Sequence, residues 1–187
     1  MLSACSTADA VLRRIERLAR HRYLPIIGPV RGRILVRLVR RYRPRHILEV
    51  GTLLGYSTIL MTKALGGEAE IVTIEVDEDE AERARENIRK AGVKPKVRVI
   101  VGDAMDIIPH LEEEFDLVFL DAAKNEYLSY LRFLEGKLLK GSLVIADNAG
   151  MLTHLMREYL DYVRNSGRYR SRFIPADGDG MEVSIKQ

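Results

Sequence analysis

Apolar and polar positions follow two different periodic patterns along the chain. In residues 8–20 the apolar side chains recur at helical spacing with arginines on the other face, which predicts an amphipathic helix. The stretch YLPIIGPVRG, residues 23–32, breaks this period with two prolines and two glycines and is expected to form a loop. A second helix is expected over about 31–42, and it should end before Pro44.

After residue 45, short apolar runs alternate with helical stretches. Strands are expected at 46–51, 71–76, 96–102, 115–121, 141–148, 168–175 and 181–186, and helices at 57–65, 77–91, 105–111, 124–138 and 151–164. This alternation is typical of an α/β fold with a doubly wound, mostly parallel sheet covered by helices on both faces. The turn DGDG, 177–180, is too short for a parallel crossover, so the last strand should run antiparallel.

The length and composition are those of one globular domain. The chain has 187 residues, of which 47% are hydrophobic and 30% charged. We expect a single domain over residues 1–187, with a helical cap at 1–45 and the sheet core at 46–187. The single cysteine, Cys5, excludes an internal disulfide, and no stretch reads as a membrane span or a signal peptide. A cytoplasmic protein is therefore expected.

Charge is distributed unevenly along the chain. Residues 11–46 contain twelve arginines and one acid, Glu16, although the whole chain carries a net charge of only +3. Such a segment can form a solvated helix face or pair with the acidic remainder of the protein, which is the simpler interpretation. Contact with the phosphates of a nucleic acid is the alternative.

A glycine-containing turn follows the first expected strand in the stretch HILEVGTLLGYS, residues 46–57. Ligands of open α/β sheets bind beyond the carboxyl ends of the strands, which is where this turn lies. Leu53 stands where a dinucleotide-binding G-x-G-x-x-G motif would need its second glycine, and no Walker lysine follows. A pyrophosphate ligand is therefore disfavoured.

Three acids at the ends of successive strands favour a different ligand. Glu49 can face a cationic amino group, Glu75 can accept both hydroxyls of a ribose, and Asp103 can accept from an adenine amino group. S-adenosylmethionine offers these groups in that order. Each acid taken singly is as well explained as a helix cap or a turn residue, and only the combination indicates the cofactor.

A second polar cluster is expected at the ends of the fourth and fifth strands. Asp121 ends one strand, and Asp147 and Asn148 end the next, so they meet if the strands are neighbours. Two carboxylates and an amide oxygen suit Mg²⁺ or another divalent cation, although a helix cap and a simple turn would also explain them. Lys124, three residues after Asp121, is either a surface lysine or a group aimed at that site.

The segments LEVGTLLGYS, IVTIEVDE, VGDAMDIIPHL, FDLVFLDAAK and LVIADN resemble the successive motifs of the metal-dependent O-methyltransferases, the family of the catechol and caffeoyl-CoA enzymes. The resemblance runs from about Ile27 to Glu182 and implies a Rossmann-like methyltransferase fold with a seven-stranded sheet. It assigns S-adenosylmethionine contacts to Ile27, Glu49, Gly51, Thr52, Gly55, Ser57, Glu75, Ala104 and Asp121. Asp103, a candidate adenine contact, departs from the residue usual in catechol-type members.

The same resemblance assigns the chemistry. It implies that Asp121, Asp147 and Asn148 bind the metal and that Lys124 is the general base. Glu182 corresponds to an acid that contacts the second hydroxyl of a catechol, and a strand residue facing water is the competing interpretation. The implied reaction is in-line transfer of the sulfonium methyl group to a metal-coordinated hydroxyl, in which Lys124 and Asn148 also touch the substrate.

The acceptor is left open by the sequence. A catechol-like small molecule is the first hypothesis, although the chain has no tryptophan to wall an aromatic pocket. The second is hydroxylated uridine in tRNA, which some family members methylate and which the arginine-rich segment would favour. The third is a non-catalytic cofactor-binding scaffold, against which the intact set of site residues speaks. The family resemblance also suggests a homodimer.

Overall fold

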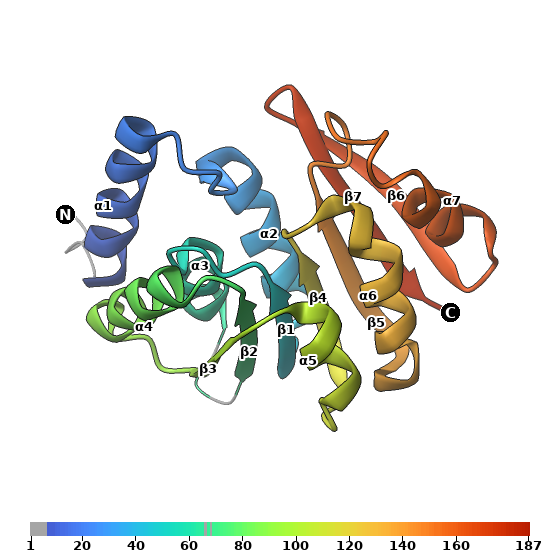
Figure 1. Cartoon of the computed structure of the whole chain (residues 1–187), viewed down its shortest axis with the longest axis horizontal. Helices are drawn as coiled ribbons and strands as arrows, with labels where there is room; N and C mark the ends of the chain where they lie inside the picture. Colours follow the sequence, from blue (N-terminus) through green and yellow to red (C-terminus); the bar gives the residue numbers. More distant parts are fainter. Residues whose placement is uncertain (1–6, 66, 68) are drawn as a thin grey trace.

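The computed structural model describes residues 7–65, 67 and 69–187, and within them one mixed sheet organises the chain (Figure 1). Its strand order is β3-β2-β1-β4-β5-β7-β6. The strands are β1 (His46–Val50), β2 (Glu70–Glu75), β3 (Lys96–Val101), β4 (Phe115–Leu120), β5 (Leu138–Asp147), β6 (Tyr169–Ala176) and β7 (Asp179–Lys186). The doubly wound, seven-stranded α/β fold expected from the sequence is thereby confirmed.

The first five strands are parallel and the last two are antiparallel. β1 pairs with β2 and β4, β2 with β3, and β4 with β5, all in parallel register. β7 inserts antiparallel between β5 and β6. Because Leu120 is opposite Ala146 in the β4–β5 ladder, the residues that follow them, Asp121 and Asp147, lie side by side at the carboxyl edge of these two strands.

Helices cover both faces of the sheet (Figure 1). They are α1 (Thr7–Arg22), α2 (Gly28–Tyr42), α3 (Tyr56–Ala64), α4 (Glu78–Ala91), α5 (Ala104–His110), α6 (Tyr127–Leu134) and α7 (Arg157–Asn165), with short 3₁₀ turns at Lys124–Glu126 and Glu135–Lys137. Side chains alternate along each strand, so Leu48 and Val50 join the core under α5, α6 and α7. Ile47 joins the core on the opposite face, with residues of α1, α2 and α3.

Several boundaries differ from the sequence predictions, among them that β5 begins at Leu138 instead of 141 and that α6 covers only Tyr127–Leu134 of the expected helix. α2 begins at Gly28, three residues earlier than expected, because Pro29 lies in the first helical turn, where no backbone N–H is needed. α7 begins only at Arg157, because the residues after Asn148 form turns instead of a helix. The last hairpin turns on Asp177 and Gly178 alone, both at positive φ, so Asp179 already belongs to β7.

No helix in the described part of the chain is long and apolar enough to cross a membrane. Cys5, on which the expectation of no disulfide rested, lies outside the described residues.

Candidate functional site

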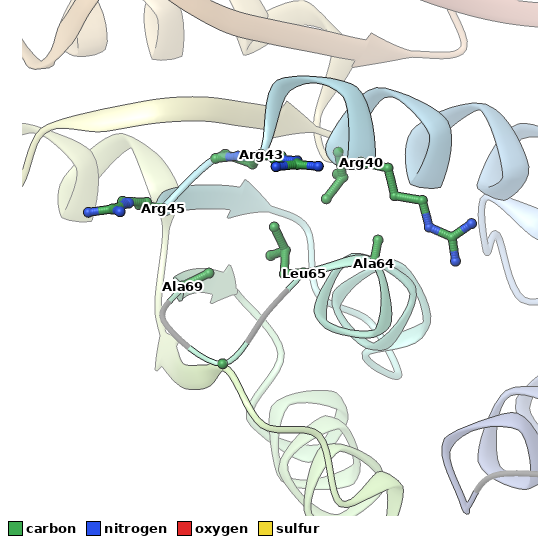
Figure 2. A pocket seen from close by; sticks show the side chains of 9 residues that line it. Arg40, Arg43, Arg45, Ala64, Leu65 and Ala69 are labelled. Atoms are coloured by element: carbon green, nitrogen blue, oxygen red, sulfur yellow. The ribbon is translucent and has the colours of Figure 1, made fainter.

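Two hollows at opposite edges of the sheet differ in their chemistry. One, of about 660 Å³, lies near the amino ends of β1 and β2, where Arg40, Arg43 and Arg45 surround apolar side chains such as Leu65 (Figure 2). None of the predicted site residues lines it. A cavity of about 570 Å³ lies at the other edge, beyond the carboxyl ends of β1, β4 and β5, and it gathers most of the predicted site.

The larger part of the predicted site lines this second cavity, which we call the cleft. The cleft is lined by Pro25, Ile26, Ile27, Arg31, Gly51, Thr52, Leu53, Tyr56, Ser57, Glu75, Val76, Asp121, Ala122, Ala123, Lys124, Asn148 and Leu152. A side cavity of about 230 Å³ shares Gly51, Glu75 and Val76 with it and adds Asp103 and Ala104. Predicted cofactor residues from five separate segments of the chain therefore line these two adjoining cavities.

The turn after β1 is shaped by Gly51. A side chain there would place its Cβ 2.2 Å from the backbone oxygen of Asp121, and φ is +97°. Only glycine allows this close approach of the two loops. The Glu75 carboxylate fastens the turn, because its Oε2 accepts from the backbone N–H of Thr52 at 3.1 Å and of Leu53 at 2.6 Å.

Glu49 lies beneath the cleft and is fully buried. Its two oxygens accept from the hydroxyls of Ser57 and Thr58, which lie in the first turn of α3. Burial raises the pKa of Glu49 to about 7, against the opposing effect of these hydrogen bonds. Ser57 lines the cleft and Glu49 does not, so the Glu49 carboxylate lies one hydrogen bond away from the cleft, behind the Ser57 hydroxyl.

Asp103 and Gly55 have local roles in the fold. The Asp103 carboxylate accepts from the backbone N–H of Met105 at 2.8 Å and caps α5, while it also lines the side cavity. Gly55, at φ +76°, precedes α3 and faces Ile88 of α4. It does not line the cleft, so the structure brings it to the cofactor region only as the end of the turn.

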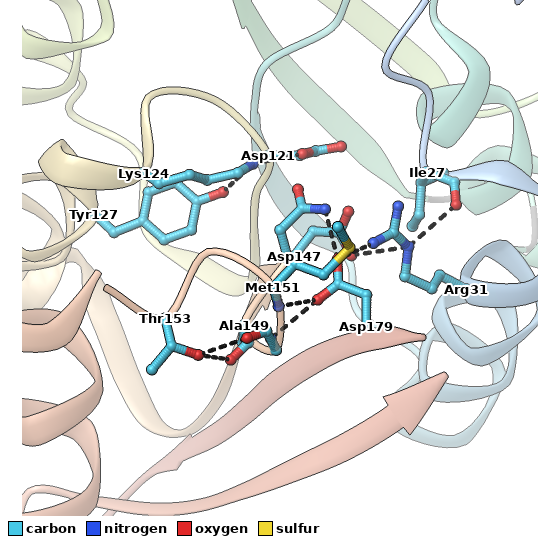
Figure 3. Close-up of polar contacts among 12 residues, drawn as sticks. Ile27, Arg31, Asp121, Lys124, Tyr127, Asp147, Ala149, Met151, Thr153 and Asp179 are labelled. Carbon is cyan, nitrogen blue, oxygen red and sulfur yellow. Dashed lines mark hydrogen bonds and ion pairs between the residues drawn. The ribbon is translucent and has the colours of Figure 1, made fainter. Parts of the chain in front are cut away.

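Lys124 lies beside Asp121, just after the carboxyl end of β4. Its Nζ lies 2.8 Å from Asp121 Oδ1 and donates to the Tyr127 hydroxyl at 2.9 Å (Figure 3). Tyr127 is fully buried, donates in turn to the backbone oxygen of Leu120, and has a pKa raised well above its usual value by burial. The Lys124 amine is therefore largely buried and fixed by two hydrogen bonds. This agrees with the interpretation that it is directed at the site and not with that of a surface lysine.

Asp147 ends β5 and Asn148 follows it, and of the two only Asn148 lines the cleft. Asp147 is 1% exposed, and its Oδ1 has no hydrogen-bond donor, although Arg31 Nε lies 3.4 Å away. Burial, and then the nearby Asp121 charge, raise the pKa of Asp147 to about 7. Two neighbouring carboxylates, of which Asp147 is buried and Asp121 partly exposed, are stabilised by a cation between them.

The donor set fits a hard divalent cation. Asn148 donates its Nδ2 to Asp179 at 2.7 Å, so its amide oxygen is left for another partner. Together with Asp121 and Asp147 it offers an all-oxygen partial shell, of the kind that Mg²⁺ completes with water or ligand oxygens. A cluster of three His, Cys, Asp or Glu side chains suited to a metal is absent from the described residues, so the amide is needed as the third ligand.

One predicted substrate residue lies elsewhere, and two residues that were not predicted belong to the site. Glu182 is fully buried, pairs with Arg164 at 2.6 Å and accepts from Ser171 at 2.6 Å, and it does not line the cleft. The structure therefore does not bring Glu182 to the substrate position that the resemblance implied. Arg31 and Asp179 were not predicted as site residues. Arg31 lines the cleft, and Asp179 bonds the side chain of Asn148 from behind.

Comparison with known proteins places these observations in a family context. Residues 3–161 match the sequence family described as O-methyltransferase. The chain is 36% identical to catechol O-methyltransferase B of Danio rerio, over 95% of this chain and 72% of that protein. It is 39% identical to a catechol O-methyltransferase of Niastella koreensis, over 65% of this chain and 57% of that protein, so it spans less than two thirds of that relative.

Solved structures agree with the sequence relatives. The O-methyltransferase TomG of Streptomyces achromogenes, in complex with S-adenosylmethionine, superposes with a TM-score of 0.86 at 28% identity, covering 96% of this chain and 90% of that one. An O-methyltransferase from Bacillus cereus, in complex with S-adenosylhomocysteine, superposes with a TM-score of 0.85 at 27% identity, covering 96% and 91%.

Proposed function

Since this chain belongs to the O-methyltransferase family, we propose that it transfers the methyl group of S-adenosylmethionine to a hydroxyl of a catechol-like small molecule, at a divalent-cation site formed by Asp121, Asp147 and Asn148. The observation that carries this proposal is that Asp121, Lys124 and Asn148 line one end of the cleft, while the buried Asp147 lies beside Asp121 at the end of the neighbouring strand. The relatives named catechol O-methyltransferase support the choice of acceptor.

The cofactor would occupy the cleft and its side cavity. S-adenosylmethionine supplies a methyl group activated by a positively charged sulfonium. Ile27, Thr52 and Ser57 line the cleft with Asp121, and Asp103 and Ala104 line the side cavity that suits the adenine. Glu75 lines both parts, as a ribose-binding acid should, and it also holds the intervening turn in place.

Lys124 would hold the proton that leaves the acceptor hydroxyl. A divalent cation bound by the two aspartates supplies positive charge that lowers the pKa of such a hydroxyl, so that a modest base suffices. The Lys124 amine is directed by Asp121 Oδ1 and the Tyr127 hydroxyl, both within 2.9 Å, and it stays near the acceptor in a fixed orientation. Methyl transfer needs little covalent help from a protein, so most of the acceleration should come from such alignment.

Apolar walls close the cleft around the reacting groups. Ile26, Ile27 and Leu152 line the cleft together with the polar residues. These side chains exclude water from the sulfonium and strengthen the electrostatic interactions among the charged groups.

The test is methyl transfer from labelled S-adenosylmethionine to 3,4-dihydroxybenzoate, with Mg²⁺ and with a chelator. We expect activity only with the metal, and little activity with 3-hydroxybenzoate, which lacks the second oxygen. Asp147→Ala should lower the rate at least about 100-fold, because it removes a ligand and leaves Asp121 as the only carboxylate.

Asp161→Ala is the matched control, because Asp161 lies on the exposed face of α7 and bonds only within that helix. It should leave the rate unchanged. An Asp147→Ala protein that methylates the catechol as fast as the unaltered protein would exclude the metal-centred mechanism while leaving the family assignment intact.

A further inference from the structure

The carboxylate of Asp179, at the start of β7, gathers the turn that follows β5 (Figure 3). Its Oδ1 accepts from the backbone N–H of Gly150 at 3.0 Å and of Met151 at 2.8 Å. Its Oδ2 accepts from Asn148 Nδ2 at 2.7 Å and from Arg31 Nη1 at 2.5 Å. Four donors from two distant parts of the chain therefore converge on one buried carboxylate.

These contacts decide which way the Asn148 side chain faces. The amide of asparagine has a donor end and an acceptor end, and a carboxylate can satisfy only the donor end. With Nδ2 held by Asp179, a reversed amide would set its oxygen against a negative charge. The Asn148 oxygen is consequently directed away from Asp179, while the residue itself lines the cleft.

The backbone of the turn is held just as closely. Asn148 has φ +60°, a left-handed conformation that asparagine adopts more readily than most residues. A Cβ on Gly150 would lie 2.9 Å from Asp179 Oδ1, so the turn and the carboxylate are in close contact. A backbone bond from Ala149 N to Gly180 O, 3.0 Å long, joins the same two segments.

Arg31 connects this arrangement to the second carboxylate of the proposed cation site. Its guanidinium bonds Asp179 and lies 3.4 Å from Asp147 Oδ1, and its Nε donates to the backbone oxygen of Ile27 at 3.3 Å. Arg31 thus balances the negative charge of Asp179. Asp179 is not one of the proposed metal ligands.

We propose that Asp179 is a positioning residue that fixes the amide oxygen of Asn148 toward the divalent-cation site. This inference rests on the proposed function, because it assigns Asp179 a role in building that same site. Asp179 acts through Asn148 and touches neither the cofactor nor the acceptor. Its removal should therefore weaken cation binding and leave cofactor binding unchanged.

The test is Mn²⁺ binding followed by electron paramagnetic resonance, with S-adenosylmethionine binding measured by calorimetry on the same samples. Asp179→Asn keeps the size of the side chain but presents an NH₂ group to donors. We expect Mn²⁺ affinity to fall at least about tenfold, as is usual when a residue that orients a metal ligand is lost, with cofactor affinity unchanged.

Asp177→Asn is the matched control. It removes one negative charge two residues away, in the turn of the same hairpin, and its φ of +55° suits asparagine. It should leave Mn²⁺ affinity unchanged. Equal Mn²⁺ affinities for Asp179→Asn and Asp177→Asn would overturn the inference.

A second variant keeps the test decisive if Asp179→Asn fails to fold. Asn148→Asp adds a negative charge to the ligand set, which by charge alone should tighten Mn²⁺ binding. If Asp179 orients residue 148 by accepting its hydrogen bond, the new carboxylate of the Asn148→Asp variant loses that bond and is repelled by the Asp179 carboxylate. Mn²⁺ binding should then weaken instead. Tighter binding by Asn148→Asp would overturn the inference.

The unaltered protein and Asp147→Ala separate this inference from the proposed function. Mn²⁺ binding that is the same in both would overturn the cation site itself, and the role of Asp179 with it. Binding that needs Asp147 but is indifferent to Asp179→Asn would overturn only the role of Asp179.

Discussion

The buried acids around the cleft differ in the donors that surround them. Glu75 accepts backbone N–H groups, which fix it as part of a turn. Glu49 accepts two hydroxyls, which only partly replace the water it loses on burial. Asp147 has an oxygen with no hydrogen-bond donor. The less an acid is satisfied by the protein, the more its charged form depends on a ligand.

Glu49→Gln should change how the stability of the cofactor-free protein depends on pH. The pKa of Glu49 is raised from 4.5 to about 7 on folding, so the folded state binds an additional proton between these values. This contribution to the free energy of unfolding is present in full below pH 4.5 and is lost as the pH rises through 7. It amounts to at most about 3 kcal/mol.

Urea denaturation at several pH values between 4.5 and 8 measures this effect. We expect the free energy of unfolding to fall less steeply with pH in Glu49→Gln than in the unaltered protein. Glu82→Gln, a change at an exposed acid of α4, should leave the pH profile as it is. Parallel profiles for the unaltered protein and Glu49→Gln would contradict the raised pKa.

Lys124→Arg tests the proposed base. Arginine keeps a positive charge beside Asp121 but cannot lose its proton at ordinary pH. We expect kcat/KM for a catechol to fall by about 10²–10⁴, the usual contribution of a general base, with cofactor affinity retained. Lys137→Arg, a change at a lysine bonded to the backbone of Ile108, is the control. Full activity of Lys124→Arg would show that the proton leaves by another route.

At the scale of elements, the site depends on how closely neighbouring loops approach at the carboxyl edge of the sheet. The turn after β1 passes so near to Asp121 that no side chain fits at Gly51. The turn after β5 is tied to the start of β7 by Asp179. A ligand-binding residue on a loop is thus placed by the loop next to it as much as by its own strand.

Gly51→Ala should destabilise the fold more than a glycine substitution with the same backbone angle elsewhere. Gly141 has φ +90°, and no atom lies within 4 Å of the position of its missing Cβ. Gly141→Ala should cost about 1–2 kcal/mol from the left-handed backbone alone. Gly51→Ala should cost roughly 1–3 kcal/mol more, because its Cβ overlaps the Asp121 carbonyl.

Thermal or urea unfolding of both variants measures the difference. The comparison isolates the contact between the two loops, since the backbone strain is common to both variants. An equal decrease in the free energy of unfolding for Gly51→Ala and Gly141→Ala would mean that the two loops can move apart at no cost.

At the scale of the whole molecule, the arginine-rich segment serves more than one purpose. Arg14 of α1 bonds Asn87 of α4, and Arg31 of α2 turns inward to Asp147 and Asp179. Arg40, Arg43 and Arg45 instead gather at the edge of the sheet opposite the cleft (Figure 2). Part of the segment thus pairs with the acidic core, as the simpler interpretation expected, while contact with RNA and the homodimer remain predictions.

Much of the site could be predicted from the sequence, because it follows from strands that are adjacent in the sheet. Asp121 and Lys124 are three residues apart, and Asp147 lies at the end of the next parallel strand. Glu182 could not be placed in this way. Its strand pairs antiparallel with β5, and the side chain is directed at Arg164 and not at the cleft.

The sequence by itself determined the order of helices and strands, the mostly parallel sheet and the acids at its carboxyl edge, because hydrophobic period and turn chemistry are local properties. Only the tertiary structure decided that Arg31 and Asp179, 148 positions apart, meet behind Asn148. In the sequence, Arg31 is one of twelve arginines in residues 11–46, and Asp179 is part of a polar turn. Their roles depend on how α2 and the β6–β7 hairpin pack against the end of β5, and packing between distant segments leaves no periodic trace in the chain.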